Sequence, residues 1–400
     1  MKRILGLLLM LLILILCSCI EEYQLKESAQ SNERQVVIQG KITSGDKSVI
    51  HISYTQPLGS KEEPETVLNA KVLIVGQNGY QSEPAQFDME NDFYWIDTEE
   101  LPSNTLYALQ VEANGETFLS EYQALLQTPD IDEVKYEEKD ESISIRLLTQ
   151  GNEHDSSHYL WTYEEDWEFH APVDIKGVSG IPFYDKNIYQ QGFSDGYNPY
   201  YYCWGHNTSA YIHIYSTENL ETNRVNIELV EIPADDIRIS YIYSILVKQW
   251  SLSNEAYRYY RALEQYVEES SGLFAPMPSE LKGNISCVSN PDVNVQGYVL
   301  ASTLQTKRIF VYNSDFTKVY PQYDGGCSWK TPDLSDNNWS HIWGESIKKG
   351  AIAITTNGYY QPSLNPNYGE STLYSRECVD CRAVEGATKK RPDFWPTDHE

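Results

Sequence analysis

Short runs of apolar residues alternate with polar positions through the first third of the chain. These runs are rich in Val, Ile, Tyr and Thr, end at Gly, Pro, Asn or Asp, and recur about every ten residues, at 36–43, 48–58, 69–76, 93–97, 107–113 and 117–125. Asn78-Gly79 and Asn114-Gly115 are typical hairpin turns. Regularly spaced short strands predict an Ig/transthyretin-like β-sandwich over residues 36–128.

The pattern changes at Thr128-Pro129-Asp130, where we place a domain boundary. Residues 129–400 are expected to form a larger β-rich domain with a helical insertion and an irregular tail. Residues 131–138 and 142–150 predict a hairpin, and 211–216, 225–232, 284–303 and 307–313 predict further strands.

Residues 158–172 alternate with a period of two. Trp161, Tyr163, Glu165, Trp167 and Phe169 share one face, and the other carries Glu164, Asp166 and Glu168. The alternation predicts a half-buried strand whose acidic face points to water. Glu164 and Glu165 point to opposite faces and cannot form a catalytic pair, whereas Glu164 and Asp166 share a face, as is common on a solvated strand.

One clear helix is predicted at about residues 253–271. Ser253 is a suitable N-cap, Gly272 a suitable C-terminal stop, and the apolar face repeats at helical spacing through Ala256, Tyr260, Leu263 and Val267. The preceding residues 241–250 are compatible with either a buried strand or a helix.

The N-terminus has the features of an exported protein. Lys2 and Arg3 precede 13 uncharged, mostly apolar residues, a length that fits a signal peptide and is too short for a membrane span. Leu16-Cys17-Ser18-Cys19 resembles a bacterial lipobox. We therefore expect a signal peptide at 1–18, lipidation of Cys19 and a polar tether over 19–35; an ordinary cleaved signal peptide is the alternative.

Composition narrows the choice of partners. The chain has 400 residues and a formal charge of −28, which disfavours nucleic acid and any contact with an anionic membrane other than through a lipid anchor. Its 31 tyrosines suit both strands and ligand contacts. Five aromatic residues gather in one Gly/Pro/Asn-rich stretch and are our candidates for binding an oligosaccharide or a peptide: Tyr197, Tyr200, Tyr201, Tyr202 and Trp204. The alternative is that they pack around Cys203.

Beyond the leader and the lipidation site, five cysteines remain as disulfide candidates: Cys203, Cys287, Cys327, Cys378 and Cys381. An oxidising compartment favours two bridges, but the sequence leaves the pairing open among 15 arrangements. Cys378-Val-Asp-Cys381 also has the spacing of a zinc half-site or a redox dithiol. No second Cys-x-x-Cys is present, so structural bridges are the better interpretation.

Two motifs of common enzyme classes are missing from the sequence, the phosphate-binding loop and His-Glu-x-x-His. His154 and His158 lie in a loop-like context, and Asp333, Asp336 and Asn338 do not have EF-hand spacing. We therefore predict no catalytic residues, no metal and no cofactor.

Several segments carry a family resemblance: the lipobox, residues 253–265, 271–291 and 297–310, and the ending Cys378-Val-Asp-Cys381-Arg with Pro392-Asp-Phe-Trp395. Together they resemble a Bacteroidota lipoprotein family known only as a domain of unknown function. Glu385-Gly386-Ala387-Thr388 departs from the Gly-Gly-Thr of the family pattern. Glu21 and Glu22 behind Cys19 resemble the family's surface-export signal. The resemblance implies an outer-membrane location facing the cell exterior, beside a TonB-dependent receptor.

The leading hypothesis is an accessory or co-receptor lipoprotein, not an enzyme, that binds a nutrient for uptake through a TonB-dependent receptor. A surface hydrolase acting on glycans or peptides is a second hypothesis, which requires two converging carboxylates. A non-catalytic adhesin module is the third.

Overall fold

The structure, a computed structural model, describes residues 34–56, 63–98, 100–173, 200–209, 212–269, 281–320, 323, 326–330, 352–355 and 371–396. The predicted signal peptide, Cys19, residues 19–33 of the tether, Tyr197 and the 333–338 segment lie outside these residues. The described chain is mostly β, with several sheets and one α-helix, so the predicted fold class is confirmed. None of its helices is long and apolar enough to span a membrane.

The first unit is a sandwich of two sheets. One of its sheets is built from β1 (Val36–Ser44), β2 (Lys47–Tyr54), β5 (Phe93–Asp97), β4 (Gln86–Asp88) and β17 (Val295–Gln296). The facing sheet contains β16 (Ile285–Cys287), β7 (Glu116–Ser120), β6 (Leu106–Ala113), β3 (Lys71–Gly76) and β8 (Gln123–Ala124). Alternate residues of both sheets fill its core, among them Ile38, Ile50, Ile74, Tyr107 and Phe118. Asn114 and Gly115 adopt positive φ in the β6–β7 hairpin, as their sequence predicts.

The first unit also takes in residues from far along the chain. Cys287 and Val299 are buried in its core, and β16 and β17 pair with β7 and β1. The predicted boundary at residue 128 therefore needs correction, because residues 285–301 complete the first sandwich. Gly297 explains the close approach there: its φ is 112°, and a Cβ would lie 1.9 Å from the Ile38 carbonyl oxygen.

The second unit is another sandwich. One layer contains β12 (Tyr202–Thr208), β11 (His158–His170), β15 (Ile242–Ser251) and β18 (Val299–Tyr312), with β13 (His213–Ser216) at the side of β11. The other contains β14 (Arg224–Pro233), β10 (Ser142–Gln150) and β9 (Ile131–Glu138). Ile145, Trp161, Tyr243 and Ile245 are among the buried residues between the layers.

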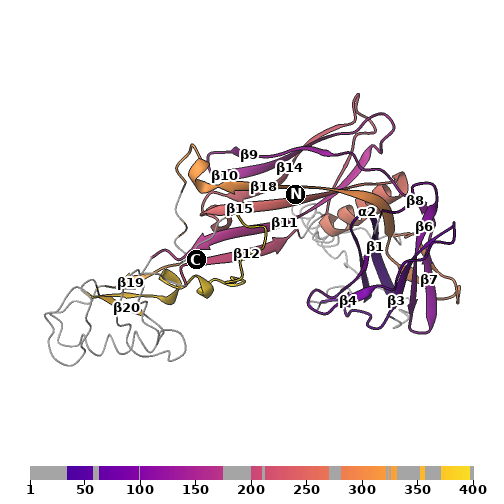
Figure 1. Ribbon diagram of the computed structural model, residues 1–400, viewed down its shortest axis with the longest axis horizontal. Coiled ribbons are helices and arrows are strands. Elements are labelled where there is room, and N and C mark those ends of the chain that lie inside the picture. The colour runs from indigo at the N-terminus through magenta and orange to yellow at the C-terminus, as the bar shows by residue number, and fades with distance from the viewer. Residues whose placement is uncertain are drawn as a thin grey trace, which may run out of the picture.

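A single long strand joins the two units. Residues 299–303 of β18 pair in parallel with β1, and residues 304–312 pair with β15. The result is one continuous ten-stranded sheet that runs from β12 to β4. Figure 1 shows the indigo first unit at the right and the second unit extending to the left, with the small β19 (Trp329–Lys330), β21 (Ser371–Tyr374) and β20 (Ile352–Thr355) sheet beyond it.

The predicted helix is α2 (Asn254–Glu269). The Ser253 hydroxyl accepts a hydrogen bond from the Ala256 amide at 3.1 Å, which confirms the N-cap. Ala256 and Tyr260 pack against Trp250 and Leu300, on the side of the continuous sheet opposite the sandwich cores. The ambiguous segment before the helix is the strand β15, whose apolar run reflects burial on both faces.

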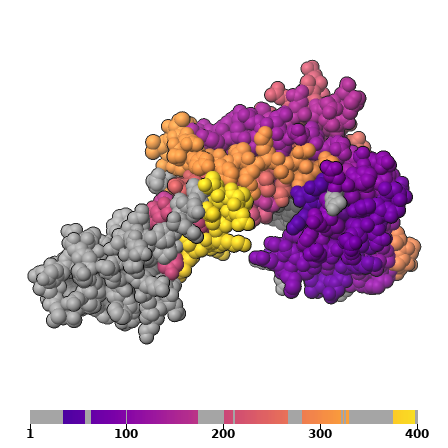
Figure 2. Space-filling view, in the orientation of Figure 1, coloured from indigo at the N-terminus to yellow at the C-terminus, as the bar shows by residue number. Residues whose placement is uncertain are grey.

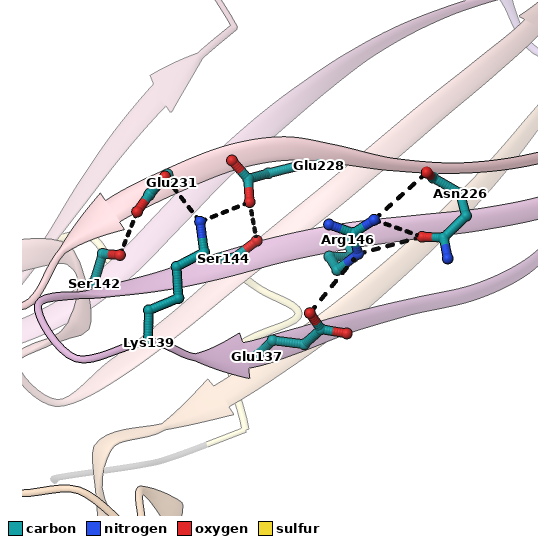
Figure 3. A network of polar contacts seen from close by, with 8 residues as sticks. All are labelled: Glu137, Lys139, Ser142, Ser144, Arg146, Asn226, Glu228 and Glu231. Atoms are coloured by element: carbon teal, nitrogen blue, oxygen red, sulfur yellow. Dashed lines mark hydrogen bonds and ion pairs between the residues drawn. The ribbon is translucent and has the colours of Figure 1, made fainter.

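The outer face of β10 and β14 is polar and its charges are matched (Figure 3). Lys139 lies 2.9 Å from both Glu228 and Glu231, and Arg146 donates to Asn226 at 2.9 Å. The hydrogen bonds that Lys139 donates to Glu228 and Glu231 raise the pKa of Lys139. Each cation on this face has a polar or acidic neighbour, as expected for a solvated sheet face.

Four short 3₁₀ segments and the residues around them complete the description. They are η1 (Ile237–Ile239), η2 (Asn313–Asp315) and the pair η3 (Arg376–Cys378) and η4 (Cys381–Ala383). The last two begin a C-terminal segment, residues 376–396, which lies over the strands of the second unit in yellow in Figure 2.

Candidate functional site

Two of the three acids on the acidic face of β11, Asp166 and Glu168, are buried, not solvated as the alternation predicts, whereas Glu164 is half-buried. The exposed fraction is 5% for Asp166 and 0% for Glu168. The sequence pattern identifies the strand and its two faces correctly, but it cannot reveal that the C-terminal segment covers one of them. Buried carboxylates require compensation, so their partners define the chemistry of this face.

Asp166 of β11 is paired with side chains from two other strands of the same sheet. Arg308 of β18 donates to its Oδ2 at 2.9 Å, and His206 Nδ1 of β12 lies 2.8 Å from its Oδ1. Arg308 also donates to the Ser244 hydroxyl at 2.9 Å, and its guanidinium lies 3.6 Å from the centre of the Phe394 ring. The carboxylate is thus held between a cation and a half-exposed imidazole.

Glu168 is paired with the C-terminal segment. The indole Nε1 of Trp395 donates to Glu168 Oε2 at 2.5 Å, although the two residues are 227 positions apart. Trp395 packs with Trp204 and Ile242 in a small apolar cluster. Asp166 and Glu168 share a face, as a hydrolytic pair would require, but each is committed to a structural partner.

Two disulfides hold the C-terminal segment, and one of them links it to β12 of the second unit. Cys203 of β12 is bonded to Cys381, and Cys327 is bonded to Cys378. The two cysteines of the Cys-x-x-Cys motif therefore belong to separate bridges, which supports the structural interpretation over a redox dithiol or zinc half-site. Cys287 is the remaining described cysteine, buried and free.

Asp380, between those cysteines, organises the motif. It is fully buried and accepts two hydrogen bonds from the Arg382 guanidinium, both at 2.9 Å. Burial opposes ionisation, but the hydrogen bonds and charge of Arg382 outweigh it and lower the pKa of Asp380. The Cys-Val-Asp-Cys-Arg sequence therefore forms a compact anchor.

Four of the predicted ligand-contact aromatics lie around this anchor. The Arg382 guanidinium lies 3.6 Å from the centre of the Tyr200 ring. The Tyr201 ring stacks on the His170 ring, and the centres of these two rings are 4.7 Å apart. Tyr202 meets Tyr201 edge to face, and Trp204 is only 6% exposed. These contacts favour the packing alternative for Trp204, which has almost no surface to offer a ligand; ligand binding by the three tyrosines stays a prediction.

Glu165, on the inner face of β11, is held by a second buried network. Arg238 donates to its Oε1 at 2.9 Å, and the Tyr243 hydroxyl donates to the same oxygen at 2.8 Å. Burial, followed by the charge of Glu165, raises the pKa of Tyr243 well above its ordinary value. Glu165, Arg238 and Tyr243 therefore form one hydrogen-bonded group at the end of the core of the second unit.

A shallow polar depression of about 600 Å³ lies where the units meet, lined by Thr128, Pro129, Asp130, Asp132, Gln150, Gly151, Asn152 and Asp155. Two of its backbone carbonyls already accept hydrogen bonds, that of Pro129 from Gln249 and that of Asp132 from Lys307. Within the described part of the chain, no group of three or more His, Cys, Asp or Glu side chains is arranged to hold a metal ion.

A comparison with known protein families identifies the family to which the chain belongs. The model of a domain of unknown function, DUF4249, matches residues 20–308, which is most of the sequence. The chain belongs to the DUF4249 family. The match includes the first unit, α2 and most of β18, and it ends before the C-terminal anchor. No curated protein matches the chain.

A comparison with solved structures found similarities to this DUF4249 chain that are low in sequence identity and in TM-score. A two-domain fibronectin type III segment of chicken tenascin is 8% identical and covers 56% of this chain and 93% of its own, with a TM-score of 0.15. Salmonella alpha-2-macroglobulin is 7% identical and covers 75% of this chain and 16% of its own, with a TM-score of 0.18.

Two residues that hold this DUF4249 chain together are not distinguished by local sequence pattern. Arg308 and Trp395 each occupy an ordinary polar or aromatic position in the sequence. Their significance depends on contacts with strands far away, which local periodicity does not encode. The one available signal was Trp395, which ends a motif that the sequence had already marked as distinctive.

Proposed function

We propose that this DUF4249 protein is a lipid-anchored outer-membrane lipoprotein that faces the cell exterior and captures a nutrient as the partner of a TonB-dependent receptor. The observation that carries the proposal is the Leu16-Cys17-Ser18-Cys19 sequence behind a 13-residue apolar run and ahead of Glu21 and Glu22. Acyl chains on Cys19 supply the anchoring, because each buried methylene contributes about 0.8 kcal/mol.

The described side chains support capture over conversion. The carboxylates of Glu165, Asp166 and Glu168 have cationic or hydrogen-bonding partners that hold them in place. A hydrolase needs acidic side chains that converge on a space open to substrate, whereas these three carboxylates are already paired with structural partners. Two rigid sandwiches tied by a shared sheet suit a binding scaffold.

Replacing Cys19 with alanine is the direct test of anchoring. We expect Cys19→Ala to release the protein from the outer membrane into the soluble fraction, because the thiol at the lipobox cysteine is lost. Cys17→Ala is the matched control and should stay membrane-bound. Fractionation followed by immunoblotting measures both, and a C19A protein that still sediments with the outer membrane would refute anchoring through this residue.

A further inference from the structure

Lys41 is a partly buried cation with no anionic partner. It projects from β1 on the side of the continuous sheet opposite the first core, and its Nζ lies 4.8 Å from the centre of the Trp250 ring. The ammonium group of Lys41 makes no hydrogen bond and no ion pair among the described residues. Other lysines of the same molecule do find carboxylates, for example Lys71 with Glu112 at 3.1 Å.

An ammonium group that is partly buried without a counterion is energetically unfavourable, and a bound anion would compensate its charge. Burial, followed by the charge of Lys248, lowers the pKa of Lys41 from 10.5 to about 8. Lys41 therefore remains mostly protonated at neutral pH. Lys248 brings a second cation to the same area, where Glu164 pairs with it.

An apolar strip runs from Lys41 across the neighbouring strands. The register places Lys41 opposite Val49, and Val49 opposite Trp95. Val49 and Trp95 are half-buried, and Lys47 lies over the Trp95 ring at 4.2 Å from its centre. With strands about 4.8 Å apart, the backbones of Lys41 and Trp95 are roughly 10 Å apart, close to the span of one or two sugar rings.

We propose that this face, formed by Lys41, Val49 and Trp95, binds an anionic saccharide. The acidic group would pair with Lys41, and a sugar ring would lie on the strip between the two lysine–indole pairs. This rests on the proposed function and deepens it by naming the class of nutrient. The negative charge of such a ligand matches this face, because the cations Lys41 and Lys47 lie on the same sheet face of a chain whose formal charge is −28.

The position of the strip favours a saccharide over an acidic peptide. β1 is hydrogen-bonded to β2 on one side and to β17 and β18 on the other, and β2 lies between β1 and β5. Their backbone groups are therefore unavailable to an added peptide strand. What the face presents is side chains: the half-buried Trp95 indole beneath Lys47, the aliphatic Val49 and the Lys41 ammonium, which suit the apolar face and the acid of a charged sugar.

The test is calorimetric titration of the purified full-length lipoprotein in detergent micelles. The probes are trigalacturonate, galactose 6-phosphate, neutral galactotriose and triglutamate. We expect at least one of the two anionic saccharides to bind and galactotriose to bind far more weakly. Comparing trigalacturonate with galactose 6-phosphate shows whether the acid is a carboxylate or a phosphate.

Three variants assign the binding to Lys41. Lys41→Met keeps the apolar contact with Trp250 and should weaken binding about tenfold or more, since a charge-assisted contact is lost. Lys41→Arg should retain binding, and Lys71→Met, on the other sheet of the same unit, should bind as the wild type does. Thermal unfolding verifies that each variant is folded.

The proposal is overturned if neither anionic saccharide binds, if a folded Lys41→Met binds as tightly as the wild type, or if triglutamate binds as well as the sugars. Failure here is distinguishable from failure of the proposed function. A protein that is anchored through Cys19 and recovered with a receptor, yet binds no charged sugar, would contradict only the ligand class.

Discussion

Replacing Arg238 with alanine is expected to destabilise the protein by about 3–5 kcal/mol, because the change leaves the Glu165 carboxylate buried without its cation. Glu165 is 1% exposed, and Arg238 is its only ion-pair partner among the described residues. Asp236 loses the same guanidinium, which lies 2.9 Å away. Urea unfolding monitored by tryptophan fluorescence measures the difference.

A control and a rescue make this prediction specific. Lys135→Ala removes an exposed pair with Glu137 and should cost under about 0.5 kcal/mol. Combining Arg238→Met with Glu165→Gln should recover much of the lost stability, since the uncompensated charge is gone. An Arg238→Ala protein as stable as Lys135→Ala would show that the buried pair has no such role.

Removing the Cys203–Cys381 disulfide is the second large effect. The bridge spans 178 positions, and a cross-link over so long a loop is expected to contribute about 3–5 kcal/mol. The double variant C203S/C381S should unfold at a lower temperature. Its C-terminal segment should also become sensitive to protease, because only non-covalent contacts, among them Trp395 with Glu168 and Phe394 with Arg308, then hold residues 381–396.

Two other cysteine changes serve as comparisons. C327S/C378S opens a loop of 51 positions and should cost less, while leaving residues 381–396 bonded to β12. Cys287→Ser touches no bridge and should leave proteolysis of the segment unchanged. Equal protease resistance of C203S/C381S and the wild type would contradict the anchoring role of this disulfide.

The strands of the first unit follow from the sequence because period-two alternation directly reflects one buried and one exposed face. The helix follows for a similar reason, since Ser253 and the apolar repeat to Leu263 are local signals. β15 stayed ambiguous because a strand buried on both faces has no alternation to detect.

The features that define the candidate site depend on long-range contacts. The alternation on β11 shows which acids share a face, but not that Trp395, 227 positions away, covers Glu168. Likewise, the boundary at residue 128 was placed from a local change of pattern, whereas the pairing of β18 with β1 returns residues 299–303 to the first unit. Lys41 is one more polar position in an alternating strand until Trp250 is placed beside it.

Affinity purification of the lipidated protein from native outer membranes in a mild detergent tests the proposed function most directly. We expect mass spectrometry to identify a TonB-dependent β-barrel receptor with the protein in every preparation, with its first peptide acylated at Cys19. Repeated recovery of the protein without any such receptor would contradict a role as the receptor's partner.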